Sequence, residues 1–158
     1  MSPVIANYME VRAAIYAAAR EAHRDPAEIR LLAVSKTFPV EPIRELYDAG
    51  VRAFGESRVT ELAEKAARLP EDIEWHFIGR LQSNKARKAV QLAKVIHSVD
   101  SAALLERLDR IADTAFRNAI PFHWPDENNR NVQLFRGKPA FLRLAYLHRV
   151  NDPAEGGL

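Results

Sequence analysis

The sequence predicts an α/β fold, namely the first half of a (β/α)₈ barrel of the TIM type, with about four to five βα units. Short apolar segments alternate with helical segments about every 20 to 25 residues, which is typical of parallel strands joined by crossover helices. A doubly wound sheet fits the same alternation, but no glycine-rich nucleotide-binding loop follows any of the strands. At 158 residues the chain is shorter than a complete barrel, which needs roughly 200 to 250 residues.

The first part of the chain predicts a helix, a strand, a second helix and a second strand. Apolar residues of the first helix recur at steps of three and four, and they are Val4, Tyr8, Val11, Ile15, Ala18 and Ala22. Residues 29–34 form a short apolar strand that ends at Ser35-Lys36-Thr37. Pro42 suits the first turn of the next helix and Gly50 lies just past its end, before a strand at residues 51–54.

The same alternation continues to about residue 118. The expected elements are helix 59–68, strand 75–78, helix 81–93 and strand 94–98. Asp100 or Ser101 caps a further helix, whose apolar face consists of Leu104, Leu108, Ile111 and Ala115. Glu61 with Lys65, and Glu64 with Arg68, are acid–base pairs four residues apart, which indicate a solvated helix face.

The regular pattern stops near Asn118, so we divide the chain into residues 1–118 and an atypical tail at 119–158. Residues 120–158 contain four of the nine prolines and three of the six glycines, and no strand–helix alternation is visible there. One interpretation is a poorly ordered natural tail. We favour the hypothesis that the reading frame changes near residue 117, which leaves the barrel truncated and the tail outside its family.

Composition limits the possible functions. A hydrophobic content of 47 % and a charged content of 28 % are typical of a globular protein, and a net charge of +2 does not call for a nucleic-acid partner. There is no cysteine, which excludes disulfides and thiolate metal sites. No apolar run is long enough to span a membrane. We therefore expect a cytoplasmic protein without membrane partners, whose oligomeric state stays open.

Lys36 is the strongest candidate for chemistry. Alternate residues of a strand share a face, so Lys36 is expected to point inward with Leu32 and Val34, at the carboxyl end where barrels place their active sites. An amine among apolar groups is a nucleophile toward aldehydes. The alternative is a lysine that only extends to solvent from the strand end.

Four motifs, in order and correctly spaced, resemble those of the pyridoxal-phosphate homeostasis family, which is related to the barrel domain of alanine racemase. They are residues 33–37 (AVSKT), 54–59 (FGESRV) with Glu61, 75–85 (WHFIGRLQSNK) and 97–101 (HSVDS). The resemblance extends from about Ile5 to Ala115. It implies a barrel that holds pyridoxal 5'-phosphate (PLP) as a Schiff base on Lys36 and takes part in vitamin B6 homeostasis, without an established catalytic activity.

The resemblance also implies two further cofactor contacts, at Ser57 and Ile78. The family usually has asparagine at the position of Ser57, so the shorter serine puts that contact in doubt. The family's phosphate-binding segment has no match in residues 120–158. A racemase-like PLP enzyme and a non-functional fragment therefore remain as alternatives.

Two other groups of residues have simpler interpretations. His76 and His97, on the third and fourth strands, are expected to line the barrel and not to bind a metal, because no third ligand is placed near them. Arg80, Lys85, Arg87 and Lys88 form a basic cluster, interpreted as a solvated helix surface, with a phosphate or RNA contact as the alternative.

Overall fold

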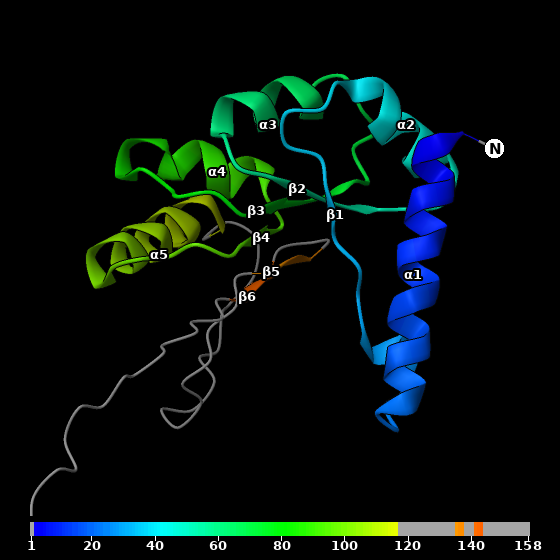
Figure 1. Ribbon diagram of the computed structural model, residues 1–158. Helices are drawn as coiled ribbons and strands as arrows, with labels where there is room; N and C mark the ends of the chain where they lie inside the picture. Colours follow the sequence, from blue (N-terminus) through cyan, green and yellow to red (C-terminus); the bar gives the residue numbers. More distant parts are fainter. Residues whose placement is uncertain (1, 117–134, 138–140, 144–158) are drawn as a thin grey trace, which may run out of the picture.

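Four parallel strands in sequential order form the main sheet of the computed structural model, which describes residues 2–116, 135–137 and 141–143 (Figure 1). The strands are β1 (Ala33–Val34), β2 (Ala53–Glu56), β3 (Glu74–Phe77) and β4 (Val95–Ile96). Helices α2 (Val40–Asp48), α3 (Val59–Ala66) and α4 (Ala86–Leu92) connect them, and α5 (Ala102–Phe116) follows β4. In a doubly wound sheet the strand order reverses at one point. The order here is sequential, which confirms the prediction that the chain forms the first half of a barrel.

Figure 1 shows α2, α3 and α4 following one another along one side of the sheet. This arrangement is the result of right-handed crossovers between strands that are added in one direction, which place each helix on the same face. Helix α1 (Pro3–Glu21) precedes this unit, and the short 3₁₀ helix η1 (Pro26–Glu28) follows α1.

The predicted boundaries differ from the observed ones mainly at β1, which covers only two residues of the predicted 29–34 segment. Among the described residues β1 pairs with β2 alone, and the ladder starts where Ala33 pairs with Phe54. Residues 29–32 lie before that ladder and therefore have no strand partner in it. The predicted helix 81–93 is also divided, into a 3₁₀ helix η2 (Ser83–Lys85) and α4.

The end of α2 shows why Gly50 is needed. Its φ of 97° lies in the left-handed region, and its N–H donates to the carbonyl of Tyr47 over 2.9 Å. The N–H of Val51 donates to the carbonyl of Leu46, also over 2.9 Å. This pair of hydrogen bonds is a Schellman motif, which satisfies the last carbonyls of the helix and turns the chain into β2.

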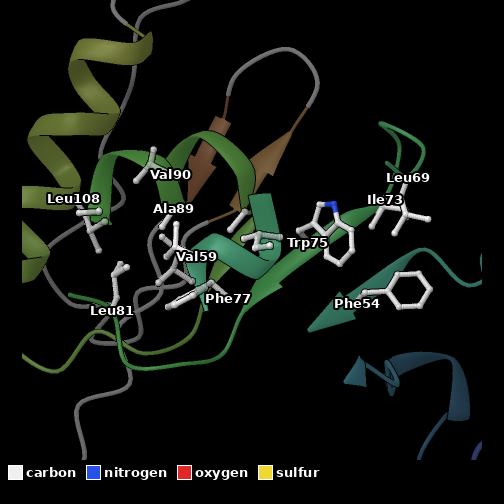
Figure 2. Close-up of a cluster of buried hydrophobic side chains, with 14 of the residues drawn as sticks. Phe54, Val59, Leu69, Ile73, Trp75, Phe77, Leu81, Ala89, Val90 and Leu108 are labelled. Atoms are coloured by element: carbon white, nitrogen blue, oxygen red, sulfur yellow. The ribbon is translucent and has the colours of Figure 1, made fainter. Parts of the chain in front are cut away.

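The hydrophobic core lies between the sheet and the helix layer (Figure 2). Phe54, Trp75 and Phe77 point from β2 and β3 toward the helices, and the rings of Phe54 and Trp75 lie 6.1 Å apart. Leu62, Ala89 and Leu108 meet them from α3, α4 and α5, each 0 % exposed. Burial of this face accounts for most of the stabilisation of the unit.

Helix α1 departs from the predicted apolar face. Val4, Ile5 and Tyr8 pack against the core, but Val11 is 49 % exposed and Ala18 is also exposed. The difference arises because α1 packs against α2 and η1, and the sheet-and-helix core covers only the beginning of the predicted stripe.

Two short antiparallel strands, β5 (Phe135–Gly137) and β6 (Phe141–Arg143), lie within the predicted tail. Their antiparallel pairing departs from the parallel alternation of the first four strands. The rest of residues 119–158 lies outside the described residues, so their origin stays a prediction. No helix in the described ranges is long and apolar enough to cross a membrane.

We expect Leu108→Ala to lower the free energy of unfolding by about 2–5 kcal/mol, because it leaves a cavity between α5 and the sheet. Leu105→Ala, on the half-buried side of the same helix, is the matched control and is expected to cost about 1 kcal/mol. Urea unfolding followed by circular dichroism measures both. Equal losses for the two variants would contradict the placement of α5 on the core.

Candidate functional site at the carboxyl ends of the strands

The three sequence-predicted site residues follow three neighbouring strands at one edge of the sheet. Val34, Gly55 and His76 are aligned by the parallel register. Lys36, Ser57 and Ile78 each come two residues later, just beyond the ends of β1, β2 and β3, so all three positions lie at the same edge of the sheet. The N–H of Ile78 donates to the carbonyl of Glu56 over 2.9 Å, which extends the ladder between β2 and β3 toward this edge.

The absence of a side chain at Gly55 lets two apolar side chains come close together on one face of the sheet. A Cβ atom at Gly55 would lie 3.2 Å from Cδ1 of Ile78 and 3.4 Å from Cδ2 of Leu32. The side chains of Ile78 and Leu32 therefore come together over Gly55, on the face of the sheet opposite to the helix layer. Leu32 and Ile78 thus provide a small apolar surface at the edge of the sheet where Lys36 follows β1.

The surroundings of Lys36 differ from the predicted ones. Lys36 is exposed, Leu32 is half-buried and Val34 is 47 % exposed. The expectation of an amine enclosed by apolar groups is therefore wrong for the described residues. The physical reason is that the core lies on the helix side of β1, while its other face stays partly open to solvent.

Ser57 lies in close contact with the segment that follows β3. A Cβ atom at Gly79 would lie only 2.0 Å from the carbonyl oxygen of Ser57, a distance that no side chain tolerates. Gly79 is thus required by the close approach of two backbones. This contact holds the half-buried Ser57 against the start of the next loop.

A buried ionic network lies behind the strand ends, on the helix side. Nζ of Lys65 donates to Oε1 of Glu56 over 2.7 Å and to Oε1 of Glu61 over 2.6 Å. It donates a third hydrogen bond, of 2.8 Å, to the backbone carbonyl of Ser35. Lys65 is 5 % exposed and Glu56 is 0 % exposed. All three N–H groups of the ammonium are used in hydrogen bonds within the protein, so this buried side chain is not available to an aldehyde.

The hydroxyl of Ser35 and the amide of Thr37 complete this network. Oγ of Ser35 donates to Oε1 of Glu56 over 2.6 Å, and the N–H of Thr37 donates to Oε1 of Glu61 over 2.7 Å. The hydrogen bond from Lys65 is the largest influence that lowers the pKa of Glu61, which keeps this carboxylate charged. Oε2 of Glu56 is buried and has no hydrogen-bond partner among the described residues.

The interpretation of Glu61 and Lys65 as a solvated helix pair is therefore wrong. The other pair, Glu64 and Arg68, is exposed as expected. The missed signal is the position of Lys65, three residues after Leu62 and four before Leu69, which are both buried. That spacing places Lys65 on the buried face of α3, where a lysine requires partners.

His76 and His97 form a pair on β3 and just after β4. Nδ1 of His76 and Nε2 of His97 lie 2.9 Å apart, so one nitrogen donates to the other, and the ring centroids are 5.2 Å apart. Burial and the neighbouring His97 lower the pKa of His76 to about 4. Burial also lowers the pKa of His97. Within the described ranges, no group of three or more potential ligands forms a metal site.

A cavity of about 860 Å³ opens beside Ser57 at the same edge. It is an open cavity bordered by the segments after β2, β3 and β4 and by the starts of α3 and α5. Its polar lining includes Ser57, Arg80, Lys85 and Asp100, and Phe77 and Leu104 add apolar surface. Nε of Arg80 lies 3.4 Å from Oδ2 of Asp100, and both side chains are exposed. The four residues of the predicted basic cluster are all exposed, which agrees with a solvated surface. The cavity is of the size that accommodates a small molecule.

Fold and site define an α/β protein of the (β/α)₈ barrel type, with an exposed lysine at the carboxyl end of its first strand. No family model matches the chain. The pyridoxal phosphate homeostasis protein of Synechocystis is 52 % identical over 90 residues, which cover 56 % of this chain and 41 % of that protein. The Escherichia coli protein of the same name is 41 % identical over 158 aligned residues, covering 95 % of this chain and 68 % of that protein. The chain belongs to the pyridoxal phosphate homeostasis protein family.

A solved structure supports the same relationship. PipY of Synechococcus elongatus PCC7942, with PLP bound, superimposes with a TM-score of 0.55 at 52 % identity, over 66 % of this chain and 49 % of PipY. The chain thus spans about half the length of several relatives that it matches.

The extent of the similarity corrects one expectation. Because the E. coli alignment covers 95 % of this chain, it continues well past residue 118. The expectation that the resemblance ends near residue 115 is therefore wrong for this relative.

We expect Gly79→Ala to lower the free energy of unfolding by about 3 kcal/mol, because the added methyl group collides with the backbone of Ser57. Gly55→Ala is the matched control, since its methyl group meets only movable ends of Leu32 and Ile78, and about 1 kcal/mol is expected. Chemical denaturation of both variants measures the difference. A Gly79→Ala protein as stable as the parent would disprove the close approach.

We expect the stability of the protein to fall as the pH decreases from 6.5 to about 4. The pKa of His76 is lower in the folded state than its ordinary value of 6.5, so the unfolded chain binds more protons in this window. His76→Gln should reduce the slope of stability against pH in this window. Denaturation midpoints measured from pH 4 to pH 8 test this. An unchanged slope in His76→Gln would refute the assignment.

Proposed function

We propose that this chain binds PLP through Lys36 and serves PLP homeostasis in the cytoplasm, without catalysing a reaction. The observation that carries the proposal is the exposed Lys36 after the carboxyl end of β1, at the edge of the sheet where Leu32 and Ile78 lie over Gly55. The names of the relatives, and PipY with PLP bound, support the same ligand.

The residues at this edge suit the cofactor. The amine of Lys36 is accessible, so it can add to the aldehyde carbon of PLP, and water leaves as the C=N bond of the Schiff base forms. We propose that Ile78 packs against the pyridine ring and that Ser57 offers a hydroxyl to a polar group of the cofactor. Lys65, which also lies near the strand ends, is buried and donates three hydrogen bonds within the protein.

The proposal of a carrier and not an enzyme rests on the relatives. Those that match are named for homeostasis and not for a reaction. A carrier needs one group that bonds the aldehyde reversibly, and Lys36 supplies it. An enzyme needs in addition a base placed at the reacting carbon.

We expect the absorbance of a lysine-bound pyridoxal to appear when PLP is added to the protein and to be lost in Lys36→Ala. Lys88→Ala, an exposed lysine on α4, is the control and should keep the full signal. Reduction with borohydride followed by peptide mass spectrometry identifies the modified residue. Retention of the signal in Lys36→Ala would remove Lys36 from this role.

The same protein distinguishes a carrier from a racemase-like enzyme. A carrier loaded with PLP leaves the α-proton of alanine in place in D₂O, whereas an enzyme exchanges it. Proton NMR of alanine follows this exchange directly. Exchange that depends on Lys36 would replace the carrier proposal with an enzymatic one.

A further inference from the structure

The network around Lys65 holds both neighbours of Lys36. Ser35 is held through its carbonyl by Lys65, at 2.8 Å, and through its hydroxyl by Glu56, at 2.6 Å. Thr37 is held through its N–H by Glu61, at 2.7 Å. Lys36 itself lies between these two anchored residues, and it is exposed.

Thr37 has an unusual backbone conformation. Its φ is 68°, in the left-handed region that a β-branched residue rarely adopts. Such a conformation persists where the surroundings impose it, and it is often found at functional sites. Here the charged hydrogen bond from Thr37 to Glu61 closes the turn directly after Lys36.

Few other contacts hold this segment. β1 contains two residues and pairs with β2 alone in the main sheet. Beyond the strand, the N–H of Ser35 donates to the carbonyl of Gly55 over 2.9 Å, and the N–H of Phe38 donates to the carbonyl of Ser35 over 3.1 Å. The side chain of Phe38 is 57 % exposed and therefore adds little packing. The ionic network is thus the main connection between the Lys36 turn and α3.

We propose that Glu61 and Lys65 are positioning residues, which fix the turn at Lys36 so that its amine is presented at the open edge of the sheet. This inference rests on the proposed role of Lys36 in binding PLP. It extends that role to residues of α3 that do not face the ligand side of the strand.

A purely stabilising role explains the network less well. Removing two carboxylates and an ammonium from water costs about as much as their attraction returns, so such buried groups are weak evidence for stability. They do impose geometry, because each hydrogen bond has a narrow range of distance and direction. A reactive group requires a supporting shell of this kind to hold its orientation.

The test compares Glu61→Ala with Glu64→Ala, an exposed glutamate on the same helix, in the full chain. The first readout needs no cofactor: hydrogen–deuterium exchange of the Thr37 amide, which should become faster by about tenfold or more in Glu61→Ala and stay unchanged in Glu64→Ala. The second readout is the rate of Schiff-base formation between PLP and Lys36, followed by borohydride trapping, and we expect it to fall in Glu61→Ala only. Thermal denaturation of the same samples detects any general loss of stability.

Glu61→Gln is expected to restore part of the behaviour that is lost in Glu61→Ala. Its amide oxygen can still accept the hydrogen bond from Thr37, so exchange and trapping should lie between those of the parent and Glu61→Ala. Equal exchange and equal trapping in Glu61→Ala and Glu64→Ala would overturn the positioning role. If the parent chain forms no Schiff base on Lys36, the proposed function fails, and the exchange of Thr37 still decides whether Glu61 holds the turn.

Discussion

The contact between Lys65 and Glu56 connects three parts of the fold at one point. Glu56 ends β2, Lys65 belongs to α3, and the third hydrogen bond of the same ammonium reaches the carbonyl of Ser35 just after β1. The sequential parallel sheet makes this possible, because it brings the carboxyl ends of neighbouring strands to one edge. Helix α3, which follows β2, begins at that edge and contacts β2.

The two faces of the sheet have different structural roles. The helix face buries Phe54, Trp75 and Phe77 and provides the stability of the unit. On the other face, Ile78 and Leu32 lie over Gly55, and His76 pairs with His97. Side chains alternate along a strand, so neighbouring residues of β2 separate these roles: Glu56 belongs to the network on the helix side, while the position of Gly55 faces the open side.

Local patterns were sufficient to predict much of this arrangement. The alternation of short apolar segments and helices predicted the parallel sheet, and the position of Lys36 after the first strand predicted its place at the edge. The interpretation of Glu61 and Lys65 on α3 was wrong, because an acid–base pair four residues apart has the same sequence pattern whether it is solvated or buried. The pairing of His76 with His97 was also not predicted, although both were expected to line the barrel. Its geometry depends on the register between β3 and β4, which periodicity does not define.

The sequence by itself determined the class of fold, the order of the elements and the family, because these depend on periodicity and on motifs that are local in the chain. The tertiary structure decided the surroundings of Lys36. It left the amine exposed where an apolar enclosure was expected, and it placed Glu56, Glu61 and Lys65 behind it. The reason is that burial and ion pairing arise between segments distant in the chain, such as Ser35 and Lys65, and only the packed fold brings their atoms within 3 Å of each other.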